Sequence, residues 1–453
     1  MTFDKTTLSM EINTDREIEE AAFGRFHFRL GALISLILFF DGFELQNSAY
    51  VVHFVAIPWG LSPGGIGMML SSGLAGFALG SAVSGLFGDR FGRRSVLLIG
   101  CWASGAMSLV IAVYAHSLYS YAALRLGMGL ALGLLMPLAV TYLNEIAPAR
   151  TSNLFAIVFF AIGWLGGSSS VGAIAVWLTP RYGWQSLYYV GGVALAIGAA
   201  IQLWLPESPR FLARHARWNE LATLLGKLRP ERVHAYRSGK FELSSAPRRG
   251  VPIRLLMQSE YRHTTLRFWA AGALSLFSAY GLSGWLPTMM LKRGETLSSS
   301  FAYGSLFASM AVVVGLMSGY AADRFGDRRR VLIASYLVGA AMVAFLAYAP
   351  THVTRLIAVA GAGGFVGGSQ LLLNNFVAVS YPTAMRSTGV GMFLAIARIG
   401  ATFGPTVAGL LQQWTGGAGA MYAAIGGATL ATAIVVSSVQ TQGRSAVVMA
   451  RIE

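Results

Sequence analysis

Residues 85–94 read Gly85-Leu-Phe-Gly-Asp89-Arg90-Phe91-Gly92-Arg93-Arg94, and residues 319–328 read Gly319-Tyr-Ala-Ala-Asp323-Arg324-Phe325-Gly326-Asp327-Arg328. Each copy lies between two long apolar stretches. A second related pair, Pro148-Ala-Arg150-Thr and Pro382-Thr-Ala-Met-Arg386, follows at nearly the same spacing. Two motifs that recur at corresponding loops indicate two homologous halves, each built from several apolar segments.

The apolar stretches are long enough to cross a membrane. The chain has 453 residues, of which 55% are hydrophobic and 12% charged, and its mean hydropathy is +0.58. These values lie outside the usual range of soluble domains. A hydrocarbon core of about 30 Å is spanned by roughly 20 apolar residues. We therefore predict an all-α polytopic membrane protein with six plus six spans, at residues 28–56, 64–88, 95–115, 118–142, 152–178, 184–205, 264–290, 298–322, 330–350, 353–380, 386–413 and 417–440.

The basic residues between these spans predict the domain organisation and the topology. The loops on one side, the central segment and both termini hold most of the arginines, whereas the opposite loops hold only Arg181, Lys292, Arg293 and Arg355. The positive-inside rule then places both termini in the cytoplasm. The predicted parts are a cytoplasmic N-terminal segment (1–27), a six-helix bundle (28–205), a cytoplasmic central loop (206–263), a second six-helix bundle (264–440) and a cytoplasmic tail (441–453).

Composition and motifs argue against other classes of protein. The net charge of +15 is not gathered into a nucleic-acid-binding arm or motif. Cys101 is the only cysteine, so an intrachain disulfide and a zinc cluster of cysteines are excluded. We find no phosphate loop, zinc-protease motif, nucleophile elbow or dinucleotide fingerprint. We expect no cofactor, no metal and no enzymatic activity, with an intramembrane enzyme and a transporter-derived sensor kept as alternatives.

The repeated loop resembles the signature of the major facilitator superfamily, and the likeness covers almost the whole chain. The run Pro206-Glu-Ser-Pro-Arg210 is similar to one in the sugar-porter and organic-ion branches. Asp41-Gly-Phe-Glu44 in the first span resembles the Asp-Gly-x-Asp motif of aromatic acid/proton symporters, with a glutamate in place of the second aspartate. The resemblance implies a twelve-helix carrier with two six-helix halves that works by alternating access.

Two carboxylates, Asp41 and Glu44, fall well inside an apolar span. A carboxylate at the bilayer midplane costs roughly 2.5 to 3.5 kcal/mol on insertion scales unless it is paired, protonated or hydrated. The two residues are three positions apart, so they lie on one face of the helix. We predict that this face lines a central cavity and that one or both carboxylates bind the coupling proton.

Two arginines, Arg125 and Arg398, are also inside predicted spans. Counting about 1.5 Å per residue places Arg125 at the depth of Glu44 and Arg398 at the depth of Asp41. Arg398 is our candidate for binding the substrate carboxylate, because a guanidinium matches a carboxylate bidentately, and Arg125 is the alternative. The structural interpretation is that Glu44 and Arg125 form a static pair that holds two spans together.

An aromatic ligand needs flat apolar walls and a few polar contacts. The candidates for these contacts lie on the first, seventh and tenth spans and are Phe43, Gln46, Asn47, Tyr280, Trp285, Gln370 and Asn374. Aromatic residues in a bundle also serve packing, and amides also bond between helices.

The charged loops predict a gating latch between the two halves on the cytoplasmic side, as the resemblance implies. Its candidates are Asp89, Arg90, Arg93, Glu145, Asp323, Arg324 and Arg386. The alternative is that the arginines of these loops act only as a topology signal.

Together these features predict a proton-coupled symporter that imports an organic anion, with an aromatic carboxylate such as a hydroxybenzoate as the leading class. A symporter of sugars or other small metabolites is the alternative. The expected partners are the acid, protons and the lipid bilayer, without nucleic acid and with a monomer as the default. The expected location is the plasma membrane, which is the inner membrane of a bacterium.

Overall fold

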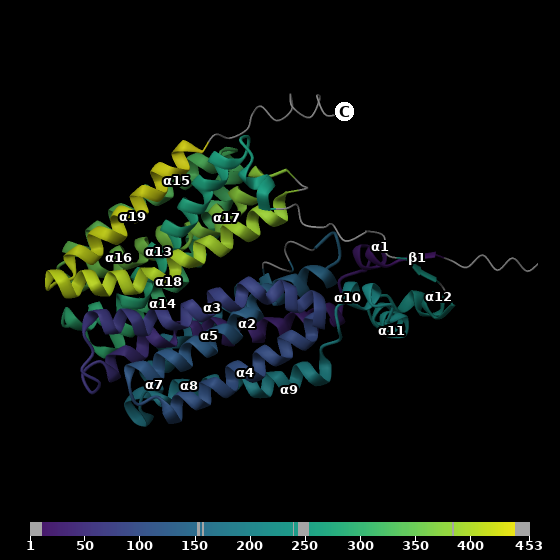
Figure 1. Cartoon of the computed structure of the whole chain (residues 1–453), viewed down its shortest axis with the longest axis horizontal. Helices are drawn as coiled ribbons and strands as arrows, with labels where there is room; N and C mark the ends of the chain where they lie inside the picture. The colour runs from purple at the N-terminus through teal and green to yellow at the C-terminus, as the bar shows by residue number, and fades with distance from the viewer. Residues whose placement is uncertain are drawn as a thin grey trace, which may run out of the picture.

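Two helical bundles lie side by side in the structure, which is a computed structural model (Figure 1). It describes residues 11–151, 155, 158–238, 240–242, 253–382 and 385–439. Outside these residues lie the beginning of the predicted fifth span, part of the central loop and the whole of the predicted tail. The first half forms the lower bundle in the view and the second half the upper one, so the predicted two-bundle architecture is observed.

The first half contains six membrane-length helical segments, and the fifth of them is interrupted by a π-helical turn. Its elements are α2 (Arg25–Val55), α3 (Pro63–Phe91), α4 (Arg93–Tyr114), α5 (Leu118–Ile146), η1 (Ala161–Leu165), α7 (Gly166–Tyr182), α8 (Gln185–Gly191) and α9 (Ala194–Trp204).

The second half repeats this plan, with its π-helical turn in the fourth segment. Its elements are α13 (Arg262–Lys292), α14 (Leu297–Phe325), α15 (Arg328–Tyr348), α16 (His352–Ala362), η4 (Gly363–Gly367), α17 (Ser369–Ser380), α18 (Arg386–Thr415) and α19 (Gly419–Ser438).

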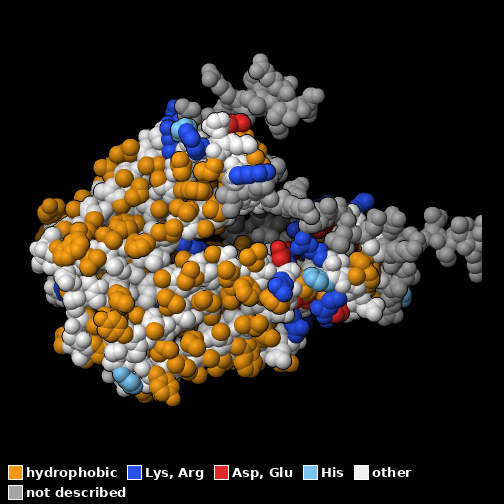
Figure 2. All heavy atoms as spheres, in the orientation of Figure 1, with side chains coloured by type: hydrophobic (Ala, Val, Ile, Leu, Met, Phe, Trp, Pro, Cys, Tyr) orange, Lys and Arg blue, Asp and Glu red, His pale blue; other side chains and the backbone are white. Residues whose placement is uncertain are grey.

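Ten helical segments of the described chain are long and apolar enough to cross a membrane. The helices α2 and α13, each of 31 residues, complete the predicted twelve. The segment Val158–Tyr182 joins η1 to α7, and His352–Ser380 joins α16, η4 and α17. The predicted spans agree with these helices to within a few residues at the ends that the structure describes. Hydrophobic side chains cover much of the outer surface of both halves, as lipid contact requires (Figure 2).

Equivalent helices in the two halves begin with the same capping chemistry. The hydroxyls of Ser62 and Thr296 accept hydrogen bonds from the first turns of α3 and α14. Ser117 and Thr351 do the same for α5 and α16. Because a short hydroxyl satisfies an otherwise unpaired backbone N–H, these residues fix where the helices start.

The repeated loop ends its helix in the same way in each half. Gly92 follows α3 with φ of 93°, and Gly326 follows α14 with φ of 69°. A side chain is disfavoured at such positive angles, so glycine lets the chain turn sharply into α4 and α15.

The central segment and the N-terminal segment fold together into a small unit that the sequence did not predict, which we call the cap. It contains β1 (Glu11–Asn13), α1 (Thr14–Glu19), α10 (Pro209–Arg214), α11 (Trp218–Leu228), η2 (Pro230–Arg232), α12 (Val233–Ser238) and β2 (Lys240–Glu242), and the turn η3 (Ile253–Met257) leads on to α13. The two strands pair in parallel, with Ile12 opposite Phe241. The carboxylate of Glu17 is bound by Arg229, Arg232 and Tyr236, which ties α1 to the central helices.

The two halves are packed together at one end and separate at the other. A single hydrophobic core joins Tyr50 and Ile66 of the first half to Phe301 and Leu286 of the second, at the end of the bundle far from the cap. At the cap end the second half has its own core, around Phe268 and Phe376. Figure 2 shows a hollow between the halves at the cap end. The structure is therefore closed at the far end and open toward the cap.

Candidate functional site

Asp41 lies in the middle of α2 at the interface of the two halves. Its side chain is fully buried, and neither carboxylate oxygen has a hydrogen-bond partner among the described residues. It interacts electrostatically with Arg398 of α18, and the indole N–H of Trp164 in η1 is directed at it, although the two groups do not meet the geometry of a full hydrogen bond. An uncompensated acid at this depth is costly, so its immediate surroundings are where a proton or a ligand is expected.

Arg398 reaches from the second half into the first. Its guanidinium lies 4.3 Å from the ring centroid of Phe77 on α3, and its Nη2 is 3.9 Å from the sulfur of Met136 on α5. The Tyr280 ring of α13 is also within electrostatic range. The described contacts of Arg398 include no carboxylate in direct contact, so its planar donor fork is available to an anion.

Glu44 is one turn farther along α2, but its carboxylate lies inside the first half. It accepts hydrogen bonds from the Ser108 hydroxyl of α4 at 2.6 Å and from the Asn47 amide at 2.9 Å. A side chain at Gly191 of α8 would overlap its carboxylate. The prediction that both acids line the central cavity is therefore wrong for Glu44. Three residues correspond to about 300° of helix rotation, which is enough to turn the second acid toward α4 and α8.

Arg125 is buried and binds the backbone of α2. Its Nη1 donates to the carbonyl of Glu44 at 2.8 Å and its Nη2 to that of Leu45 at 3.4 Å. The predicted common depth of Arg125 and Glu44 is confirmed by this contact. A static pair between the guanidinium and the Glu44 carboxylate, the structural interpretation, is not formed. Arg125 instead fastens α5 to α2 through main-chain carbonyls, which leaves Arg398 as the guanidinium without a strong acceptor.

The predicted pocket residues divide into two groups. Tyr280 and Gln46 line a small cavity between the halves, together with Leu45, Ser48, Ala49, Leu70, Leu74, Ser283, Gly284 and Pro405. Asn47 holds Glu44, Phe43 is fully buried against Phe40, and the indole of Trp285 donates to the Pro405 carbonyl at 2.9 Å. These three residues serve packing in this conformation.

The two predicted amides of the tenth span bind each other. The side-chain amide of Gln370 donates to Asn374 at 2.7 Å, and the buried Oε1 of Gln370 has no described partner. The free oxygen is an acceptor that a hydroxyl-bearing ligand could use.

The predicted latch residues form separate clusters in the two halves. In the first half Arg93 pairs with Asp89 at 2.8 Å and with Glu145 at 3.1 Å, and Glu145 also accepts the Ser208 hydroxyl at 2.5 Å. These contacts lie within one half, because the two halves are apart at the cap end.

The remaining latch candidates are near the surface. Asp323 pairs with Arg328 at 2.9 Å within the second half, and Arg90 lies over the ring of Phe91. Arg324 and Arg386 are exposed. The predicted latch between the halves stays a prediction for another conformation.

The sequence reasoning missed Ser108, Trp164 and the tyrosines around Arg125. Tyr121 and Tyr188 are hydrogen-bonded to each other, and Tyr121 also donates to Ser48. The spacing of four residues from Tyr121 to Arg125 on one helix face could have indicated the first tyrosine. Ser108 and Trp164 carry no local signal, since only the packing of other helices against α2 brings them to the acids. The described residues contain no group of three or more His, Cys, Asp or Glu side chains placed to hold a metal.

Comparisons with known proteins agree with this arrangement. A family model described as Major Facilitator Superfamily matches residues 32–320 and 304–446. The chain is 33% identical to a gallate transporter of Pseudomonas putida, over 89% of this chain and 90% of that protein. It is 30% identical to the 4-hydroxybenzoate transporter PcaK of Acinetobacter baylyi, over 91% of each. The inward open xylose transporter XylE of E. coli superposes with a TM-score of 0.71 at 17% identity, covering 94% of this chain and 99% of that one, a likeness of fold alone.

Proposed function

We propose, from the premise that this chain belongs to the major facilitator superfamily, that it carries an aromatic carboxylate into the cell together with protons by alternating access. The observation that carries the proposal is the buried, unpartnered carboxylate of Asp41 on one half, facing the guanidinium of Arg398 on the other. The chain is similar to a gallate transporter and a 4-hydroxybenzoate transporter over about nine-tenths of their lengths, and their names support an aromatic acid as the substrate class.

In the proposed site the substrate carboxylate binds Arg398. Phe77 lies under the guanidinium and Tyr280 nearby, so an aromatic ring bound to Arg398 by its acid group would rest against aromatic walls. The indole N–H of Trp164, beside Asp41, is a hydrogen-bond donor that can serve a ring hydroxyl. A benzoate bearing hydroxyls therefore fits this lining better than a neutral sugar, which offers nothing to the guanidinium.

Coupling follows from competition for one positive charge. Without substrate, Arg398 compensates the ionised Asp41 across the interface. When a substrate carboxylate takes the guanidinium, Asp41 is left as an uncompensated acid in a low-dielectric site, and protonation relieves that cost. Anion and proton are then bound together, and the loaded site is neutral, as the empty Asp41–Arg398 pair is, whereas the anion without the proton would leave one negative charge.

Glu44 is proposed to modulate the coupling of proton and anion binding from its position inside the first half, one helical turn from Asp41. Its partners, the Ser108 hydroxyl and the Asn47 amide, are neutral, so they can accommodate either protonation state of the carboxylate. The Ser108 hydroxyl also lies 2.8 Å from the Tyr188 carbonyl, and its single proton can go either to that carbonyl or to Glu44, so its direction depends on whether Glu44 is protonated. A change of protonation at Glu44 would thus alter the contact between α4, α8 and α2.

The opening between the halves at the cap end corresponds to the inward-facing state in this proposal. The cap, both termini and the arginine-rich loops are then cytoplasmic, and the protein is a monomer in the inner membrane of a bacterium. Residues at the far end form the closed outer gate. Among them are Ser71 and Thr406, whose hydroxyls are hydrogen-bonded at 2.8 Å. The separate charge clusters of Asp89 and Asp323 would meet only when the cytoplasmic side closes.

The experiment that tests the function uses the purified full-length chain reconstituted in liposomes. An imposed inward proton gradient should drive accumulation of labelled 4-hydroxybenzoate or gallate, and a protonophore should abolish it. A thermal-shift panel of gallate, 4-hydroxybenzoate, benzoate and xylose should show stabilisation by the aromatic acids, since a ligand at 100 times its Kd adds about 2.7 kcal/mol. Stabilisation and uptake with xylose but not with any acid would reject the anion assignment in favour of the sugar alternative.

A further inference from the structure

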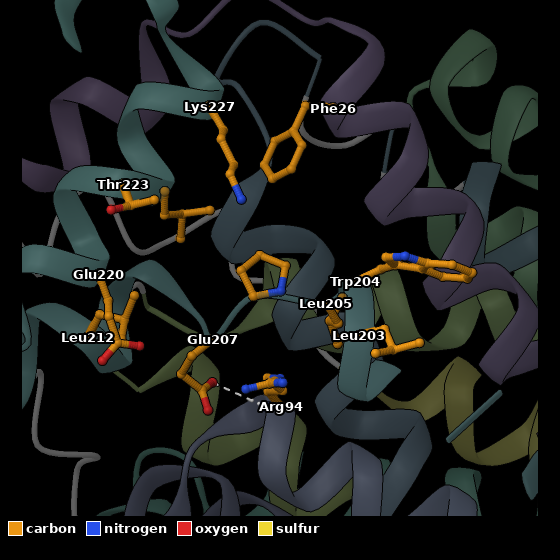
Figure 3. Close-up of a pocket in the computed structure, with 12 residues that line it drawn as sticks. Phe26, Arg94, Leu203, Trp204, Leu205, Glu207, Leu212, Glu220, Thr223 and Lys227 are labelled. Atoms are coloured by element: carbon orange, nitrogen blue, oxygen red, sulfur yellow. Dashed lines mark hydrogen bonds between the residues drawn. The ribbon is translucent and has the colours of Figure 1, made fainter. Parts of the chain in front are cut away.

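A second pocket lies away from the central site, where the first half meets the cap. Its volume is about 290 Å³, near the lower end of the range for ligand sites, and it is partly open to solvent. Its walls come from the ends of α2, α4 and α9 and from α10 and α11 (Figure 3). Nothing in the proposed transport cycle uses this pocket.

Two cations of the pocket have unused hydrogen-bonding capacity. Lys227 of α11 extends its ammonium group into the pocket, opposite Arg94 and Glu207 (Figure 3). Lys227 has no ion-pair partner among the described residues. The guanidinium of Arg94 donates to the Gln202 carbonyl at 2.6 Å, but its buried Nε–H has no acceptor.

The two acids of the pocket already have partners, which are backbone N–H groups for Glu207 and an arginine for Glu220. Glu207 accepts the backbone N–H groups of Arg94 at 3.0 Å and Ser208 at 2.8 Å. Glu220 pairs with Arg217 at 2.6 Å. Lys227 and Arg94 are therefore the groups left to attract a ligand, and they favour an anion with several acceptor oxygens.

One wall of the pocket continues onto the membrane-facing surface. Leu203 and Trp204 end the transmembrane helix α9 and are 74% and 69% exposed. A tryptophan at the end of a membrane helix lies at the level of the lipid headgroups. An anion in the pocket is thus next to an apolar surface that acyl chains can cover.

We propose that this pocket binds the phosphate group of an anionic phospholipid, with Lys227 and Arg94 as the phosphate ligands and the acyl chains along Leu203 and Trp204. The lipid would join α9 of the membrane bundle to α11 of the cap. A bound phosphodiester supplies the oxygen acceptors that the two cations lack, and the apolar rim selects a lipid over a soluble phosphate.

The test is native mass spectrometry of the full-length protein titrated with phosphatidylglycerol. Wild type should retain phosphatidylglycerol in preference to phosphatidylcholine, and Lys227→Gln should weaken retention about fivefold, equivalent to ~1 kcal/mol. Lys227→Arg keeps the charge and should retain the lipid. Arg330→Gln removes an exposed basic residue at the cap end of the second half and is the matched control, expected to behave as wild type.

Three results would overturn the proposal. The first is equal retention of phosphatidylglycerol by wild type and Lys227→Gln, since Lys227 is then not a ligand. The second is equal retention of phosphatidylcholine, which would remove the requirement for an anionic lipid. The third is full displacement of the lipid by inorganic phosphate at the same concentration, which would make the site one for soluble phosphate. Trp204→Ala should weaken lipid retention without changing any binding of inorganic phosphate.

Discussion

The two halves share one fold but differ in where they hold charge. Within its spans the first half buries Asp41, Glu44 and Arg125, surrounded by hydroxyl, amide and phenol groups. In the described part of the second half no charged side chain is fully buried, and Arg398 projects across the interface into the first half. Proton chemistry and anion binding are thus divided between the halves, which means that their relative movement changes the interaction between the acid and the guanidinium.

The same difference is seen in the repeated loop. The first copy is tightly held, because Asp89 and Glu145 share Arg93 and Glu207 caps the start of α4. In the second copy Asp323 is 72% exposed and pairs only with Arg328 in the described chain. Among the described residues the cap covers only the first half. The cytoplasmic end of the first half is therefore held by more contacts than that of the second half, which is freer to move.

The largest expected effect comes from removing the guanidinium of Arg398, which crosses the interface. Arg398→Gln should lower proton-driven uptake of the acid by roughly 30-fold to several thousand-fold, because loss of one partner of a desolvated charge pair costs about 2–5 kcal/mol. Uptake into proteoliposomes measures this effect. The control is Arg181→Gln, which removes an exposed arginine stacked on Trp177 and should leave uptake unchanged. Normal uptake by Arg398→Gln would contradict the proposal that the first half binds the proton and the second half binds the anion.

The next effect separates the two acids of the first half. Asp41→Asn should abolish accumulation driven by a proton gradient, at least about 30-fold, while exchange of labelled for unlabelled substrate continues, because a neutral amide cannot carry a proton. Glu44→Gln keeps a side chain that can bind Ser108 and should reduce accumulation only about three- to tenfold. If Glu44→Gln is as defective as Asp41→Asn, coupling involves both carboxylates equally.

The smallest effect concerns the far end of the second half, where Glu295 is bound by Arg355 at 2.9 Å and by His352 at 3.1 Å. Burial acts to raise the pKa of the Glu295 carboxyl, but hydrogen bonds from His352, Ser299 and Arg355 outweigh it and hold this pKa below its ordinary value. A lowered folded-state pKa stabilises the protein above the unfolded-state pKa and ceases to do so as the pH falls through the folded-state value.

Glu295→Gln should therefore lower Tm by roughly 1–2 °C at pH 7, with a shrinking difference from wild type as the pH falls below about 4.5. Thermal unfolding in detergent across this pH range measures it, with Asp327→Asn as a control at the other end of the half, where asparagine can still cap α15. Uptake should stay normal, because this cluster lies outside the site. A Tm difference that grows in acid would contradict the assignment.

The sequence by itself determined the twelve spans, the two halves and the depth of the buried charges. These follow from local properties, since apolar length, capping residues such as Ser62 and Thr296, and the rise per residue act along a single helix. The sequence also indicated the transporter family and the candidate residues Asp41, Glu44 and Arg398. A charged residue in an apolar span can be recognised without coordinates.

Only the tertiary structure decided what each buried charge faces. The rotation of α2 and the packing of α4 and α8 against it turn Glu44 toward Ser108, direct Arg125 to backbone carbonyls and leave Asp41 opposite Arg398. The union of the N-terminal segment with the central helices into a cap, through Glu17 and a strand pair, depends on contacts across more than 200 residues. Such long-range contacts are set by the mutual fit of whole helices, and no short stretch of sequence carries that information.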